Sequence, residues 1–123
     1  MIGSTRRVGV YVYGAPVDMR KSFDTLSVLV TQQMGQELLS GDIFLFVGKN
    51  RRRAKALFWD GTGLCIYSKR LEKGRFTAVW KQPEGVTIRM TLSELSLLLE
   101  GSELAGKVSL SPAPFVLGAA QAA

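Results

Sequence analysis

The residues best suited to a binding function in this chain are nine lysines and arginines between positions 49 and 75. Only Asp60 and Glu72 oppose them within that segment, so the net charge of +6 is concentrated there. A cationic field confined to one folded segment favours a polyanion such as nucleic acid, because neutralised phosphates release their condensed counterions. We therefore predict a phosphate-binding surface within this segment.

The basic side chains fall into two clusters, one on each side of a predicted hairpin. Three consecutive arginines at positions 51–53 exceed the acidic partners nearby, so several must face solvent or an anion. The alternative is a solvated loop that serves solubility alone. Arg20 and Lys21 fall in the first turn of a predicted helix, where Asp18, Asp24 or an external phosphate would offset the unfavourable helix dipole. The alternative to an anion-binding role is plain solvation or pairing with Asp24. The predicted phosphate contacts are Arg51, Arg52, Arg53, Lys55, Lys69, Arg70, Lys73 and Arg75, with Arg20 and Lys21 as additions.

Residue types argue against catalysis. The chain has no histidine, which removes Ser-His-Asp and Cys-His arrangements and histidine zinc sites. Its single cysteine, Cys65, can form neither an intrachain disulfide nor a thiolate metal cluster. Asp18, Asp24, Asp42 and Asp60 suffice in number for two magnesium ions, but each also fits an ordinary role in a helix cap, first turn or loop. We expect no catalytic residue, no metal site and no cofactor.

Three aromatic residues accompany the basic segment. Trp59, Tyr67 and Phe76 are of the type that stacks on exposed bases in single-strand binders. A chain of 123 residues also needs its large aromatics for a core. We expect these side chains to serve the core rather than to stack on bases.

Length and composition indicate one folded unit. The hydrophobic content of 46% supports a single α+β domain over residues 1–106. Residues 107–123 are small and apolar, and we expect them to form a tail that is mobile or held only by Phe115 and Leu117. No apolar run approaches the roughly 18 residues of a membrane span, and residues 1–7 do not lead into a secretory signal. We therefore expect a cytoplasmic protein without a membrane partner.

The predicted strands place the two basic clusters in neighbouring loops. Residues 54–59 and 64–69 alternate around Asp60-Gly61, and an Asp-Gly pair between such runs favours a hairpin turn. Residues 43–47 form a continuous apolar run, which is typical of a strand buried on both faces. Further strands are predicted at residues 7–13, 76–81 and 86–90.

Two helices complete the predicted fold. The first begins with Asp18 or Ser22 as its N-cap and ends near Gly35. The second begins with the capping box Thr91-Leu92-Ser93-Glu94 and ends at Gly101. Their predicted apolar stripes are Phe23, Leu26, Val30 and Met34 in the first, and Leu92, Leu95, Leu98 and Leu99 in the second. The sequence thus predicts an α+β fold, a mostly antiparallel sheet in the form of a β-meander with two helices packed on it.

Several separate blocks of the chain, in one order between about residues 7 and 104, resemble a known family. The blocks are GAPVDMRKSFD at 14–24, SGDIFLF at 40–46, NRRR at 50–53, WDG at 59–61, KRLEKGRF at 69–76 and LLLEG at 97–101. Together they resemble the TnpB accessory protein, encoded by the second reading frame of insertion sequences of the IS66 family. The resemblance implies a small bacterial protein encoded beside a separate transposase and needed for efficient transposition, with no established catalytic residues.

Charge and resemblance together suggest two hypotheses for function. In the first, the chain is a non-catalytic accessory protein of DNA transposition whose partners are DNA at the element ends and the transposase of the same element. No residue set for reading bases stands out, so we expect weak sequence preference and affinity on the order of micromolar or weaker at physiological salt. In the alternative, the basic face contacts an acidic protein surface and the chain has no DNA binding of its own. Neither hypothesis sets an oligomeric state.

Overall fold

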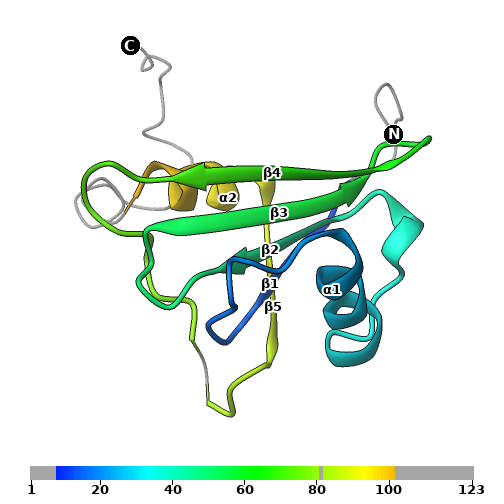
Figure 1. Ribbon diagram of the computed structural model, residues 1–123, viewed down its shortest axis with the longest axis horizontal. Helices are drawn as coiled ribbons and strands as arrows, with labels where there is room; N and C mark the ends of the chain where they lie inside the picture. The colour runs from blue at the N-terminus through cyan, green and yellow to red at the C-terminus, as the bar shows by residue number, and fades with distance from the viewer. Residues whose placement is uncertain (1–7, 81, 102–123) are drawn as a thin grey trace.

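The computed structural model describes residues 8–80 and 82–101, which form a five-stranded sheet with a helix on each face (Figure 1). The strands run in the order β4-β3-β2-β1-β5 across the sheet. Their bounds are Val10–Tyr13 for β1, Ile43–Val47 for β2, Arg53–Trp59 for β3, Leu64–Arg70 for β4 and Thr87–Met90 for β5. The predicted α+β class, the antiparallel β2-β3-β4 meander and the fully buried strand are confirmed. The parallel pairing of β1 with β2 was not predicted.

Strand β2 supplies the centre of two hydrophobic cores. Phe44 and Phe46 point to one face of the sheet and pack with Leu57 of β3 and with Val30. Ile43, Leu45 and Val47 point to the opposite face. Residues 44–47 are all fully buried, which explains why this strand reads as an unbroken apolar run.

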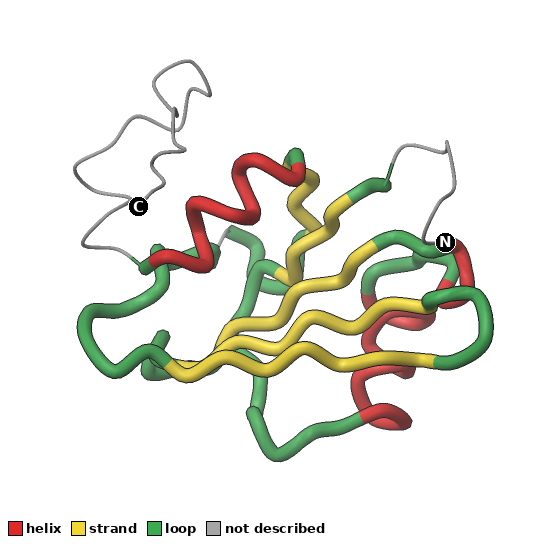
Figure 2. Tube along the Cα trace, turned by 90° about the horizontal axis from the view of Figure 1, so that it is seen from above, coloured by secondary structure: helices red, strands yellow, loops and turns green. Residues whose placement is uncertain are grey.

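Helix α1 (Phe23–Val28) covers the first of these cores. It begins at the N-cap Ser22 and continues without a break into the π-helical turn η1 (Leu29–Gln33). Figure 2 shows these helical turns at one end of the sheet. Leu26, Val30 and Met34 are buried as predicted, whereas Phe23, at the first helical position, is 44% exposed and lies outside the stripe. A short 3-10 turn, η2 (Leu38–Ser40), leads into β2.

Helix α2 (Leu92–Glu100) covers the second core. Its predicted capping box is confirmed: the backbone N–H of Glu94 donates to Thr91 Oγ1 (3.1 Å), and the Thr91 N–H donates to Glu94 Oε1 (2.8 Å). Leu95 and Leu98 are buried against the sheet, whereas Leu92, at the first helical position, is 47% exposed and does not belong to the stripe as predicted. Because α1 and α2 lie on opposite faces, the sheet is shielded on both sides.

The predicted strand at residues 76–81 is wrong within its described part. Residues 71–80 form an irregular segment, and residue 81 lies outside the described residues. Leu71, Phe76 and Val79 are buried in the core under α2, so the apolar pattern reflects burial without strand pairing. Residues 102–123, including the predicted tail, also lie outside the described residues.

The hairpin of β3 and β4 is confirmed, with Asp60 closing its turn. Asp60 Oδ1 accepts hydrogen bonds from the backbone N–H groups of Thr62 and Gly63, both at 2.9 Å. These two donors stabilise the carboxylate and lower the pKa of Asp60 from 3.8 to about 2. Gly61 adopts a φ of +109°, a conformation that glycine takes without strain. Asp60 therefore stabilises the turn that connects the two strands.

The Asp60 turn predicts a specific acid sensitivity. Because the folded-state pKa of Asp60 lies below its ordinary value, the stabilisation is fully present above pH 3.8 and is lost as the pH falls through about 2. Asp60→Asn keeps an oxygen acceptor but removes the titration. We expect its Tm to fall less between pH 4 and pH 2 than that of the wild type, measured by circular dichroism. An identical fall in both proteins would contradict this role, and Asp24→Asn in the first turn of α1 is the control.

The capping box predicts a measurable cost for removing its hydroxyl. Thr91→Ala leaves the Glu94 N–H without its side-chain acceptor at the start of α2. We expect the free energy of unfolding to fall by about 1 kcal/mol, measured by urea denaturation. Ser93→Ala, an exposed position in the same helical turn, should change it by much less. Equal losses in the two variants would show that the cap is not the cause.

Candidate nucleic-acid interface

The two basic clusters occupy adjacent loops at one end of the β3-β4 hairpin. The backbone N–H of Leu71 donates to the carbonyl of Arg52, and the N–H of Phe76 donates to the carbonyl of Arg51, both at 2.7 Å. Arg51 adopts a left-handed conformation with φ of +60°, and Asn50 Oδ1 accepts from the Arg52 N–H (2.9 Å). The predicted proximity of the two loops is confirmed, and the backbone of the arginine triplet is held in place.

Arg53 and Arg70 lie directly opposite each other on β3 and β4. The neighbouring residues Arg52 and Leu71 share a backbone hydrogen bond. Because hydrogen-bonded and non-hydrogen-bonded pairs alternate, Arg53 and Arg70 form a non-hydrogen-bonded pair, the kind with the closer side chains. Like charges directly opposite one another destabilise a sheet. An anion bound beside the two guanidinium groups would relieve this repulsion.

Glu72 supplies a negative charge beside Arg70, but the ion pair is weak. Its Oε2 lies 3.3 Å from Arg70 Nε, and both side chains are exposed. Ion pairs of this kind contribute about 0–1 kcal/mol at most and are easily replaced by another anion. For Arg53 the structure gives no acidic partner among residues 8–80 and 82–101.

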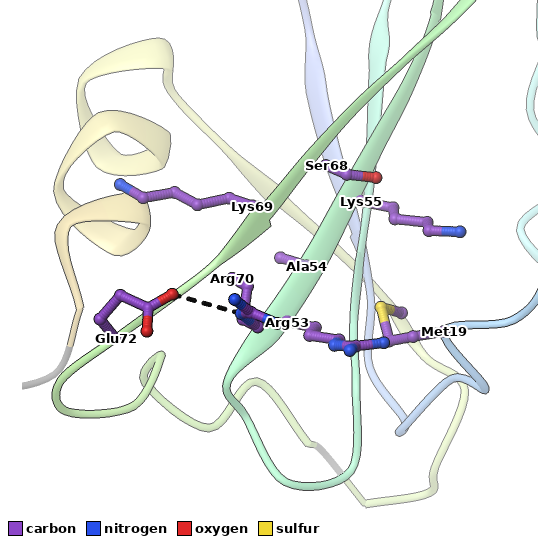
Figure 3. A pocket seen from close by; sticks show the side chains of 8 residues that line it. All are labelled: Met19, Arg53, Ala54, Lys55, Ser68, Lys69, Arg70 and Glu72. Atoms are coloured by element: carbon purple, nitrogen blue, oxygen red, sulfur yellow. Dashed lines mark hydrogen bonds and ion pairs between the residues drawn. The ribbon is translucent and has the colours of Figure 1, made fainter.

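An open hollow of about 400 Å³ surrounds this arginine pair. Its lining comes from the two strands, their flanking loop and the segment before α1: Met19, Arg53, Ala54, Lys55, Ser68, Lys69, Arg70 and Glu72 (Figure 3). A second open hollow of about 700 Å³ shares Met19 and Arg53 and adds Arg20 and Lys49. We call the surface made by Met19, Arg20, Lys49, Arg53, Lys55 and Arg70 the arginine groove.

The segment before α1 forms one wall of the arginine groove. The backbone N–H of Val17 donates to the carbonyl of Val47 at the end of β2 (3.1 Å). Gly48 leaves room for Met19, because a Cβ at this position would lie 2.8 Å from Met19 Cγ. The wall is thus fixed against the sheet from which Arg53 projects.

Lys55 ties this wall to β3. Its Nζ donates to the backbone carbonyl of Lys21 at 2.7 Å, and the side chain is half-buried. An ammonium group has three donors, so a second partner remains available to Lys55 in the arginine groove. Lys55 therefore combines a structural contact with a position beside the arginine pair.

Lys69 points to the opposite face of the sheet. Side chains alternate along β4, and Lys69 Nζ donates to the carbonyl of Leu99 near the end of α2 (2.7 Å). Figure 3 shows Lys69 and Lys55 directed away from each other. A lysine bonded to the last carbonyls of a helix also complements the helix dipole. Lys69 is one of the residues that line the hollow, but its ammonium group is bonded on the α2 face, apart from the guanidinium groups of Arg53 and Arg70. The prediction of a single basic face requires all three on one face.

Arg20 has a local partner. Its Nε and a terminal nitrogen bond the two carboxylate oxygens of Asp18 at 3.0 and 2.7 Å. This contact holds the pKa of Asp18 well below its ordinary value and raises the pKa of Arg20. Arg20 precedes the N-cap Ser22, so it lies outside the helix rather than in its first turn. Of the partners considered for it, the structure pairs it with Asp18. Lys21 contributes its carbonyl to the contact with Lys55.

The remaining predicted contacts lie around the arginine groove rather than in it. Arg52 is exposed and Arg51 is half-buried on the anchored loop. Lys73 and Arg75 are exposed on a segment whose flanking residues, Leu71 and Phe76, are buried under α2. Lys49 was not among the predicted phosphate contacts, although its position two residues before the arginine triplet indicated that it belonged with them.

The structure supports ordinary roles for the other candidate residues. The Asp42 carboxylate accepts from the Gly9 N–H (2.9 Å), and Asp60 closes the hairpin. No cluster of three or more acidic, cysteine or histidine side chains within the described ranges is placed to hold a metal ion. Phe76 is buried in the core, as expected. Trp59 is half-buried outside both core clusters, and Tyr67 is 50% exposed, so the expectation of a core role is confirmed for Phe76 alone. None of the described helices is long and apolar enough to cross a membrane.

Comparison with known proteins gives one family. A family model described as IS66 Orf2 like protein matches residues 8–108. Two proteins of Sinorhizobium fredii (strain NBRC 101917 / NGR234), named uncharacterized protein y4hO and uncharacterized protein y4jC, are 36% and 34% identical to this chain over 101 residues. The alignments cover 82% of this chain and 86% and 85% of the relatives. No solved structure matches the chain.

Proposed function

Because the chain belongs to the IS66 Orf2-like family, we propose that it is a non-catalytic accessory protein of DNA transposition that binds the DNA phosphate backbone through the arginine groove. The family places the chain with insertion sequences. The proposal of direct DNA contact rests on the arginine groove. Its partners would then be DNA at the element ends and the transposase of the same element.

The observation that carries this proposal is the pairing of Arg53 with Arg70 on adjacent strands. Two guanidinium groups at the closer kind of cross-strand position repel each other unless an anion lies between them. A phosphate satisfies both, because its oxygens accept the forked N–H groups of arginine in bidentate hydrogen bonds. Lys55 and Lys49 add positive charge at the sides of the same groove.

The shape of the arginine groove favours contact with the backbone over contact with bases. It is an open hollow lined by residues of β3, β4 and the neighbouring loops, and none of the described residues that line it belongs to a helix that could enter the major groove of DNA. Phosphate contacts position a protein without reading sequence. We therefore expect weak sequence preference and a Kd on the order of micromolar or weaker at physiological salt.

The same cations suit one further class of ligand, the carboxylates of an acidic surface on the transposase. In that case the chain would assemble with the transposase without touching DNA itself. Both ligands use charge-assisted hydrogen bonds to arginine, so geometry alone favours neither. Binding measurements on the isolated protein distinguish them.

Arginine variants test the groove directly. Arg53→Ala and Arg70→Ala should each flatten the slope of log affinity against log salt by about one unit, because each removes about one phosphate contact. Fluorescence anisotropy on duplex DNA at several salt concentrations measures this slope. Element-end and random duplexes should give similar slopes.

Arg89→Ala is the matched control. Arg89 lies on β5, at the other edge of the sheet, with its guanidinium carbon 5.3 Å from the centre of the Tyr11 ring. Its loss removes the same charge and should leave the slope unchanged. Equal effects of all three variants would refute a localised groove. If the wild type fails to bind DNA at low salt, while Arg53→Ala abolishes co-purification with the transposase, the groove binds protein instead.

A further inference from the structure

Among residues 8–80 and 82–101, strand β4 forms one edge of the sheet, with no strand on its outer side (Figure 1). Soluble proteins usually shorten, charge or cover such edges, because unpaired backbone groups recruit other strands. The opposite edge, β5, follows this rule, since it has four residues and carries Arg89. By contrast, β4 has seven residues and no charge between Leu64 and Ser68. Within the described part of the chain, this edge lacks the usual protection over most of its length.

The register identifies which backbone groups of β4 face outward. The N–H of Leu71 donates to the carbonyl of Arg52, so this pair is hydrogen-bonded. Hydrogen-bonded pairs recur at every second residue of an antiparallel ladder, so residues 69, 67 and 65 also direct their backbone N–H and C=O groups toward β3. Leu64, Ile66, Ser68 and Arg70 therefore direct theirs away from the sheet. The structure gives these outward groups no hydrogen-bond partner among the residues it describes.

We propose that β4 pairs antiparallel with β4 of a second copy, joining the two sheets into one. Outward-facing residues must pair with outward-facing residues, and full overlap of the two strands centres the pairing on Tyr67. Ile66 then forms a hydrogen-bonded pair with Ser68 of the second copy, and Leu64 does so with Arg70. Tyr67 meets Tyr67 of the second copy in a close, non-hydrogen-bonded pair.

Charge distribution within β4 supports this partner and this direction. In the antiparallel register Lys69 lies opposite Cys65 of the second copy, and Arg70 lies opposite Leu64, so no like charges meet. A parallel register would bring the cations of both strands together, which is destabilising. The two Arg70 side chains lie at opposite ends of the interface, about 20 Å apart for a strand of this length. That distance exceeds the Debye length of about 8 Å at physiological ionic strength, so their repulsion is largely screened.

The side chains of β4 also fit a self-complementary interface. Tyr67 is 50% exposed in the single chain, and pairing would bury part of its ring against an identical ring. Leu64 and Ile66 are only half-buried beside α1 and would gain cover from the second strand. The contact is isologous and therefore closes as a dimer without forming fibres.

Light scattering coupled to size exclusion tests the dimer in the absence of DNA, so the result does not depend on the proposed function. The molar mass measured for the full chain should be twice the 13.5 kDa of a single chain. Ser68→Pro removes an outward N–H that β3 does not use and should give a folded monomer. Ser68→Ala keeps the N–H and should remain dimeric. A monomeric wild type at several hundred micromolar would overturn the proposal.

A second variant covers the case in which Ser68→Pro fails to fold. Tyr67→Lys changes an exposed side chain and sets two cations directly opposite each other, so it should yield a monomer with an unchanged circular dichroism spectrum. A dimer that persists in Tyr67→Lys would place the contact elsewhere on the protein and overturn the proposal.

Cysteine cross-linking tests the register. In a Cys65→Ser background, Tyr67→Cys brings two cysteines together at a close pair and should form an intermolecular disulfide on mild oxidation. Ser68→Cys is also at an exposed position, but its Cα would lie more than 7 Å from its counterpart, beyond disulfide reach. Cross-linking of Tyr67→Cys alone supports the register. Failure of Tyr67→Cys to cross-link, or equal yields from both variants, would overturn it.

Discussion

Strand β2 must be covered on both faces, and the rest of the fold satisfies that requirement. Phe44, Leu45, Phe46 and Val47 are all fully buried, two on each face of the strand. Burying an aliphatic or aromatic side chain of this size contributes about 1.5–3 kcal/mol. One helix cannot cover two faces, so the chain divides its apolar residues between α1 on one side and α2 with residues 71–80 on the other.

This division places the basic loops. The chain leaves β4 on its way to the α2 face, and it passes the β2-β3 connection as it crosses. The carbonyls of Arg51 and Arg52 accept hydrogen bonds from this passing segment, which fixes the backbone on which the arginine side chains are mounted. Two lysines then connect the sheet to the segments that cover it. Lys55 donates to a carbonyl of the segment before α1, and Lys69 donates to a carbonyl near the end of α2. The charge of this region therefore serves both assembly of the domain and display of the arginine groove.

Local patterns in the sequence predict the parts of the fold that depend on neighbouring residues. The apolar run of β2, the turn at Asp60 and the capping box at Thr91 each reflect contacts within a few positions. The parallel β1-β2 pair was not predictable in this way, because period-two alternation identifies strand faces but not which strand lies alongside. The same restriction applies to residues 76–80. Their buried apolar residues give a pattern typical of a strand, although the segment is a loop.

For the candidate site, too, the sequence predicts the features that are local and misses those that depend on distant residues. A count of charges located the region and the two loops, since neither requires knowledge of distant partners. The separation of Lys69 from Arg53 and Arg70 depends on a carbonyl 30 positions away, at Leu99, and on strand alternation fixed by the register. The groove wall at Met19 depends on the close approach of that residue to Gly48, which no local pattern records.

The pairing of β1 with β5 has a consequence for synthesis of the protein. Val10 lies opposite Met90, so one side of the first strand cannot be completed until almost all of the described chain has left the ribosome. At about 5–20 residues per second, translation of the intervening segment takes on the order of ten seconds. During that time Val10 and Val12 lack the cover of α2, and contacts of such long range are slow to form. The nascent chain must therefore remain free of aggregation with an incomplete sheet until its last strand emerges.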